Sequence, residues 1–169
     1  MSNRGRSLLI GGIHLLLVAS LTGKLIVDRV TLPRGWARAV AYDPDLPIRG
    51  RYVSLTLIVP PVDSATTDSL YRNYFGHLTV VGDRVKSTFG TADVDQSVHW
   101  TVRAGDSVLV LHDPVAFFIP DGVPDPSIRP AGEALWAEVT IPRRGPPRPI
   151  RLGVSTGEGP IVPLKISGQ

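Results

Sequence analysis

Apolar residues follow two patterns along this chain, one continuous run near the beginning and a series of short alternating stretches after it. The run SLLIGGIHLLLVASLTG, residues 7–23, contains no acidic residue and no Lys or Arg. Because the stem of Lys24 can reach toward lipid headgroups, the apolar length extends to residue 27 and becomes about 20 residues, enough to cross a bilayer. The pattern predicts a transmembrane anchor over residues 7–27, with residues 1–6 as a short cytoplasmic tail.

Two interpretations compete for this segment. A cleaved signal peptide needs a short apolar run followed by small residues, and Val18-Ala19-Ser20 would supply the cleavage site. Apolar residues continue past that point, so the pattern favours an uncleaved anchor. Basic residues lie on both sides of the span and do not decide the orientation. The tiny leading segment favours a cytoplasmic N-terminus, with residues 28–169 as an extracytoplasmic domain on the inner (cytoplasmic) membrane.

Beyond residue 28 the apolar positions alternate with a period of two, which is typical of β-strands. In the stretch 52–59 the alternation places Val53, Leu55, Leu57 and Val59 on the core face. Gly82-Asp83 and Ala104-Gly105-Asp106 predict hairpin turns. Further strands are expected at residues 37–41, 78–81, 84–89, 99–103, 107–112, 117–119, 133–141, 149–154 and 161–166, and a short helix fits only residues 64–74.

This series of short strands joined by turns, without helices alternating between them, excludes a parallel βαβ sheet. The 17 Gly and 16 Pro residues also suit short strands with many turns better than long helices. The sequence therefore predicts a mainly β fold, an antiparallel β-sandwich or barrel-like domain, preceded by one N-terminal transmembrane helix.

The stretch YDPDLPIRGRYVSLTL, residues 42–57, joins an Asp- and Pro-rich loop to a strand. It resembles bacterial membrane-anchored proteins named for the motif Gly-Asp-Tyr-x-x-Leu-x-Tyr, the GDYXXLXY domain. Gly50, Tyr52 and Leu55 occupy motif positions, whereas Arg51 and Leu57 stand where the family has Asp and Tyr.

Two later stretches extend the resemblance over nearly the whole chain. Phe118-Ile119-Pro120-Asp121-Gly122 is similar to a Phe-x-Pro-Glu-Gly element of the family, and residues 137–152 look like its closing hairpin. The resemblance implies an anchored β-domain and a multi-pass membrane protein as partner, because family members often accompany such proteins. It implies no reaction, since the family has no assigned activity.

Composition narrows the function classes. Apolar residues make up 43% of the 169 residues and charged residues 20%, which is typical of a globular domain. The absence of Cys excludes a disulfide scaffold, a thiolate metal site and a Cys nucleophile. The net charge is +3, but the basic residues are scattered, which argues against nucleic acid as a partner.

No catalytic or metal-binding set emerges from the motifs. The four His residues are not spaced as metal ligands, and we expect those in strands to be surface or cross-strand residues. The stretch Gly153-Val154-Ser155-Thr156-Gly157 matches Gly-x-Ser-x-Gly, but no helical pattern follows it, as a nucleophile elbow requires. No Gly-rich phosphate loop occurs outside the apolar run. A Ser–Lys dyad would need a Ser just beyond the membrane, and no Ser lies between Ser20 and Ser54. The sequence predicts no cofactor and no metal, and favours a protein without catalysis.

The loop before the strand is the candidate site. Pro44 and Pro47 stiffen it, and Gly50 brings two Arg residues together at the start of the strand. The hypothesis is a binding surface made of Asp43, Asp45, Arg49, Arg51, Tyr52 and Asp121. The alternative is structural, with the two loop acids satisfying turn amides and pairing with the Arg residues.

The leading hypothesis is therefore an anchored extracytoplasmic accessory or interaction protein. It would contact the bilayer through residues 7–27 and would accompany a multi-pass membrane protein, whose helix could approach closely at Gly11 and Gly12. The alternative is a periplasmic hydrolase or ligand-binding domain with its site at the Asp43–Tyr52 loop.

Overall fold

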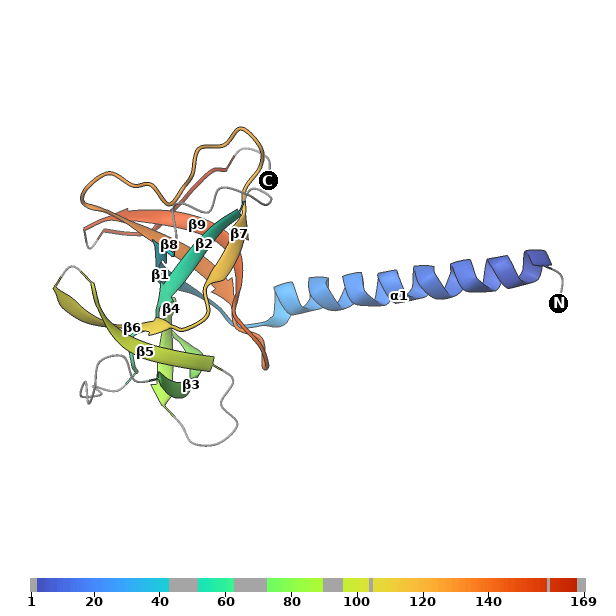
Figure 1. Ribbon diagram of the computed structural model, residues 1–169, viewed down its shortest axis with the longest axis horizontal. Helices are drawn as coiled ribbons and strands as arrows, with labels where there is room; N and C mark the ends of the chain where they lie inside the picture. Colours follow the sequence, from blue (N-terminus) through green and yellow to red (C-terminus); the bar gives the residue numbers. More distant parts are fainter. Residues whose placement is uncertain are drawn as a thin grey trace. The chain divides into compact units, whose positions relative to one another are not determined.

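The computed structural model describes residues 3–42, 52–62, 73–89, 96–103, 105–157 and 159–166 (Figure 1). The chain forms two compact units, Met1–Leu32 and Pro33–Gln169. The first contains the helix α1, and the second contains every strand found in the described residues.

The helix α1 spans Asn3–Thr31 and is one continuous element. Its segment Leu9–Asp28 is long and apolar enough to cross a membrane, as expected either of an anchor or of a signal sequence. Its large apolar side chains are exposed. The imidazole Nδ1 of His14 donates to the carbonyl oxygen of Ile10, 2.8 Å away, so the polar ring within the apolar run has a partner inside the helix.

Over the residues that the structure describes, the second unit contains ten strands. In chain order these are β1 (Arg34–Ala41), β2 (Tyr52–Ile58), β3 (Asn73–Val81), β4 (Arg84–Phe89), β5 (Gln96–Arg103), β6 (Asp106–Leu111), β7 (Val115–Phe118), β8 (Glu133–Thr140), β9 (Arg148–Thr156) and β10 (Val162–Pro163). The expected alternation of short strands and turns is confirmed.

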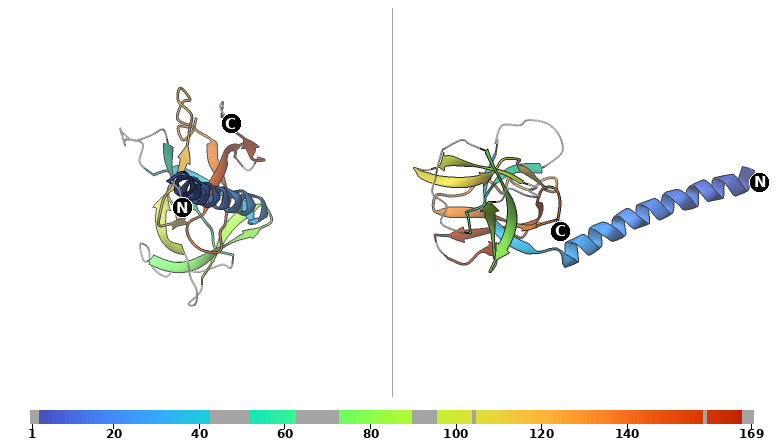
Figure 2. Two further views of the ribbon diagram at one scale, coloured as in Figure 1. Left: turned by 90° about the vertical axis from the view of Figure 1, so that its right-hand side faces the viewer. Right: turned by 90° about the horizontal axis from the view of Figure 1, so that it is seen from below.

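Six of these strands close into a barrel. The ring runs β1–β4–β3–β5–β6–β2 and returns to β1 through the antiparallel pairing of β1 with β2. Figure 2 shows the β3–β4 hairpin (green) and the β5–β6 hairpin (yellow) curving along one side of the barrel. The strands β8, β9 and β10 extend the sheet from the other edge of β1, and β7 pairs with the first half of β2. Of the two architectures predicted, the barrel is the one that forms.

One edge of β1 pairs with both β4 and β2, and these two pairings close the ring. Near its start, the amide of Trp36 donates to the carbonyl oxygen of Asp83, 2.7 Å away, where Trp36 lies opposite Arg84 of β4. From Arg38 onward, the same edge pairs with β2, and Arg38 lies opposite Ile58. The side chains of Trp36 and Arg38 share one face because residues two apart in a strand point the same way.

The core fills the inside of the barrel, and the alternation predicted for β2 is confirmed. Val53 is 7% exposed, and Leu55, Leu57 and Val59 are fully buried. Neighbouring strands contribute Ala37, Ala39, Val85, Val98, Leu109, Leu111, Ala137, Val139 and Leu152 to the same cluster. Small Ala residues on β1 and β8 let these two strands approach the larger side chains opposite them.

The structure corrects several predicted boundaries. The short helix expected at residues 64–74 is wrong at its end, because residues 73 and 74 belong to β3; residues 64–72 lie outside the described part of the chain. The last strand is two residues long rather than six.

Candidate functional site

Only part of the predicted binding set falls on described residues. Tyr52 and Asp121 are described, whereas Asp43, Asp45, Arg49 and Arg51 lie outside the described part of the chain. Tyr52 begins β2 and lies opposite Phe118, the last residue of β7. Asp121 follows Phe118 by three residues, in an exposed turn. The fold therefore brings the chain segments carrying Tyr52 and Asp121 to the same end of the β2–β7 pair.

Exposed aromatic rings gather at this end. The ring centres of Tyr52 and Phe118 are 6.1 Å apart, and Phe118 is 73% exposed. Tyr42, 57% exposed, continues β1 beside them, where its amide donates to the carbonyl oxygen of Ser54. We call Tyr42, Tyr52 and Phe118 the aromatic rim. Exposed aromatic side chains of this kind are enriched at protein interfaces.

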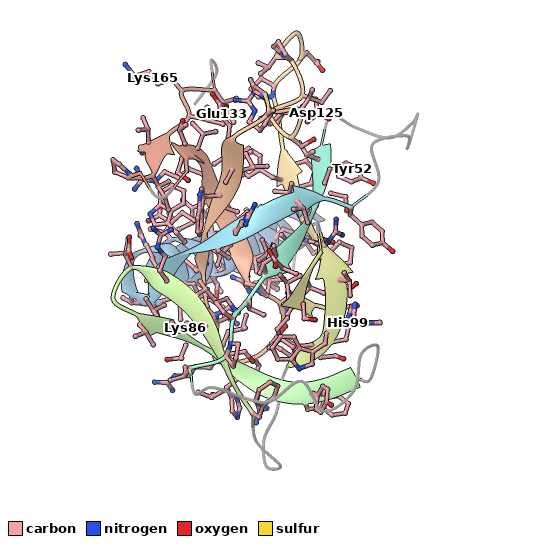
Figure 3. The ribbon with its side chains drawn as sticks, turned by 90° about the vertical axis from the view of Figure 1, so that its left-hand side faces the viewer. Tyr52, Lys86, His99, Asp125, Glu133 and Lys165 are labelled. Carbon is pink, nitrogen blue, oxygen red and sulfur yellow. The ribbon has the colours of Figure 1, made fainter. Side chains whose placement is uncertain are left out.

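A second feature lies farther along the same strands. This feature is an open hollow of about 440 Å³, which we call the cationic groove. It is lined by Trp36, Arg38, Arg84, Lys86 and Trp136. Its apolar surface also includes Ile58, Pro60 and Val85. In Figure 3, Lys86 on β4 lies well apart from Tyr52. Along β1, Arg38 and Tyr42 are four residues apart, about 13 Å.

Arg84 is held by two neighbours in this groove. Its guanidinium carbon lies 4.2 Å from the ring centre of Trp136, a cation–π stack that crosses over β1. Its Nε lies 3.3 Å from Oδ1 of Asp83. Its Nη1 is buried and has no hydrogen-bond partner among the described residues. An unsatisfied buried donor costs about 1–3 kcal/mol, more for a charged group.

The two Trp rings of the groove are also fixed by the strands beneath them. Nε1 of Trp136 donates to Oγ of Ser155, 2.8 Å away, across the β8–β9 pair. The ring of Trp36 lies over Gly153, where an added Cβ would come within 2.9 Å of it. Gly153 thus provides the space that Trp36 occupies, and both indoles have defined positions.

The charge of the groove is positive. Its described lining residues include Arg38, Arg84 and Lys86 and no carboxylate. At its border, Arg151 on β9 forms an ion pair with Glu138 on β8. Glu158 lies between two lining glycines in the sequence and is outside the described residues.

Sequence reasoning missed this groove. Its charged and aromatic members come from β1, β4 and β8, and each strand contributes only one or two of them to the outer face. A Trp or Arg at an outward position of one strand is common on protein surfaces. Only the strand order β8–β1–β4 shows that these positions meet.

A histidine pair lies away from both features. The rings of His99 on β5 and His112, just after β6, are 5.6 Å apart in an edge-to-face arrangement. Burial lowers the pKa of His99, and the charge of His112 lowers it further. The expectation of cross-strand histidines holds here, and among the described residues no group of three possible metal ligands occurs.

Comparisons with protein-family models, with curated proteins and with solved structures found no match to this chain. In the part of the chain that the structure describes, the fold is a β-rich domain with a closed six-stranded barrel and added strands, preceded in sequence by one apolar helix.

Proposed function

We propose that this protein is a single-pass membrane protein whose barrel lies outside the cytoplasm and acts, without catalysis, as an accessory subunit of a multi-pass membrane protein. On this proposal it resides in the inner (cytoplasmic) membrane and is a divergent member of the GDYXXLXY family. The observation that carries the proposal is the aromatic rim beside the motif strand β2. An exposed Phe and two exposed Tyr residues at one edge suit contact with a partner.

The apolar helix supports the membrane part of this proposal. The segment Leu9–Asp28 has the length of a bilayer span, and all its described side chains up to Val27 are exposed. In water such a surface would be unfavourable, whereas lipid would cover it. Gly11 and Gly12 have open space around them, which permits close approach of another helix.

Topology can be tested first. The chain has no Cys, so a single Cys added after Gln169 is the only thiol. We expect an impermeant thiol reagent to label it in intact cells once the outer envelope is opened. Labelling only after lysis of the inner membrane would contradict an extracytoplasmic barrel, and recovery of the chain from cytosol would contradict the anchor.

The partner contact can be tested separately. We expect the full chain, purified in mild detergent, to carry a stoichiometric multi-pass protein, and the double variant Tyr52→Ala/Phe118→Ala to lose it. Phe75→Ala is the matched control, because Phe75 on β3 is 57% exposed and lies outside the rim. Retention of the partner by the rim variant would remove the rim from the interface.

The second candidate is a ligand-binding or hydrolytic site at the Asp43–Tyr52 loop. It is supported by the position of Tyr52 and Asp121 on segments at one end of the β2–β7 pair. A purified monomer that turns over peptide or sugar substrates would favour this candidate over the accessory subunit.

A further inference from the structure

We propose that the cationic groove is a binding site for a small organic anion, a carboxylate or phosphate carried on an apolar body about one ring in size. The site lies outside the aromatic rim, and the proposal does not depend on the accessory function or on the orientation of the barrel.

Size and lining favour a small molecule. A hollow of about 440 Å³ falls within the range of small-molecule sites, which are mostly apolar with a few placed polar groups. Here two indole rings and the side chains of Ile58, Pro60 and Val85 supply the apolar surface. An apolar body would therefore leave water on entering the groove.

Charge selects an anion. Arg38 and Lys86 are contributed by β1 and β4, and Arg84 of β4 stacks on Trp136. No described lining residue carries a negative charge. Oxygen atoms of a carboxylate or phosphate are the preferred partners of a guanidinium group, and such charge-assisted bonds are stronger than neutral ones.

Arg84 is the residue on which recognition would centre. The stack on Trp136 and the contact with Asp83 fix the plane of its guanidinium group, while Nη1 lacks an acceptor among the described residues. An entering carboxylate or phosphate oxygen would be an acceptor for this guanidinium group. The arginine is thus ordered before the ligand binds, which reduces the entropy lost on binding.

The chain contains its own reporter for this site. Of its three Trp residues, Trp36 and Trp136 line the groove, and Trp100 is 7% exposed in the core. In a Trp100→Phe background, indole emission comes from the groove alone. Ligand entry would then change the emission spectrum directly.

The test is a fluorescence titration of the full-length Trp100→Phe protein in zwitterionic detergent. The probes are cyclohexanecarboxylate and cyclohexyl phosphate, with the neutral cyclohexanecarboxamide and the cationic cyclohexylmethylammonium as matched controls. We expect at least one of the two anions to change the emission in a saturable manner. The amide should bind at least about tenfold more weakly than that anion, and the cation should not bind.

Variants locate the effect. Arg84→Gln should weaken anion binding about tenfold or more. If Arg84→Gln fails to fold, Arg38→Gln replaces it, because Arg38 is exposed on β1 and should lose affinity without loss of folding. Arg144→Gln, an exposed Arg outside the groove, is the control that should bind as before.

Three outcomes would overturn the proposal. Equal affinity for the carboxylate and the amide would show that the groove recognises only the apolar part of the ligand. Unchanged anion binding in folded Arg84→Gln and Arg38→Gln would place the anion elsewhere. A response to nanodiscs containing phosphatidylglycerol, without any response to the soluble anions, would replace the small ligand by a lipid surface.

Discussion

The aromatic rim and the cationic groove occupy two ends of one outward surface on β1 and β2, and they differ in how their rings are held. Tyr52 and Phe118 contact each other, and Phe118 is 73% exposed. Trp136, in contrast, donates a hydrogen bond to Ser155 and stacks under Arg84. Rings that the fold leaves exposed suit contact with a large partner, whereas rings that the fold fixes suit a shaped site for a small ligand.

The same comparison separates the effect of a substitution on folding from its effect on binding. Groove side chains stabilise the barrel through contacts with three strands, so their removal affects folding as well as binding. Rim side chains are exposed, so their removal should affect binding more than folding. Substitutions at the two ends can therefore show whether the distinction is real.

The largest expected effect is that of Trp136→Ala. The variant loses the stack with Arg84, the hydrogen bond to Ser155 and the packing of an indole, and we expect the free energy of unfolding to fall by about 2 kcal/mol or more. Thermal and urea unfolding of the full chain in detergent, followed by circular dichroism of the β-signal, provides the measurement. Phe118→Ala should change that free energy by no more than about 0.5 kcal/mol. Equal losses in the two variants would remove the contrast between rim and groove.

The fold class could be predicted because its main determinant is local. The alternation Val53, Leu55, Leu57 identifies a strand and its core face without reference to any other part of the chain. The Gly82-Asp83 turn likewise specifies a hairpin, and the register Val81 opposite Arg84 follows from it. Neither feature distinguishes a sandwich from a barrel, because closure depends on the pairing of β1 with β2 and with β4 along one edge.

The two candidate sites, in contrast, depend on contacts between strands that are far apart in the sequence. Tyr52 was a candidate because a motif surrounds it, but its neighbour Phe118 comes from a pairing between strands 66 residues apart in sequence. The groove depends still more on topology, since Arg84 meets Trp136 only because β4 and β8 flank β1. Long-range strand order is not encoded in periodicity, so the residues of the groove could not be grouped from the sequence.

A second prediction concerns the space beneath Trp36. In Gly153→Ala the added Cβ would lie 2.7 Å from Cγ2 of Ile161 and 2.9 Å from the Trp36 ring, so both side chains must move. We expect a loss of about 1–2 kcal/mol in the free energy of unfolding and a shift of the Trp36 emission in a Trp100→Phe/Trp136→Phe background. Gly105→Ala is unsuitable as a control because Gly105 has a φ of 91°. Ala116→Gly, on the exposed face of β7, should leave the Trp36 spectrum unchanged. An unshifted spectrum in Gly153→Ala would show that Gly153 does not set the position of Trp36.

A third and smaller effect is expected at the border of the groove. Arg151 pairs with Glu138, and its guanidinium carbon lies 5.4 Å from the ring centre of Trp36. Because the Arg151 side chain is 48% exposed, we expect Arg151→Gln to lower the free energy of unfolding by about 0.5–1 kcal/mol. Salt should reduce the difference between the two proteins. A loss as large as that of Trp136→Ala would mean that the border of the groove contributes as much to stability as its interior.

The smallest expected effect comes from pH and lies outside both regions. Burial first, and the charge of His112 second, lower the pKa of His99 below its ordinary value of 6.5. The folded state therefore binds fewer protons than the unfolded state in this range, so the free energy of unfolding should fall as pH decreases from 7 through 6.5 toward 5.5. The described residues of rim and groove include no His. Acidification should therefore lower the thermal midpoint of the barrel while leaving the affinity of the groove for a carboxylate nearly constant.

His99→Asn should remove most of the pH dependence of the midpoint, and His112→Asn only the smaller part that arises from its charge. If His112→Asn flattened the profile as much as His99→Asn, the repulsion between the two rings rather than burial would be the main cause.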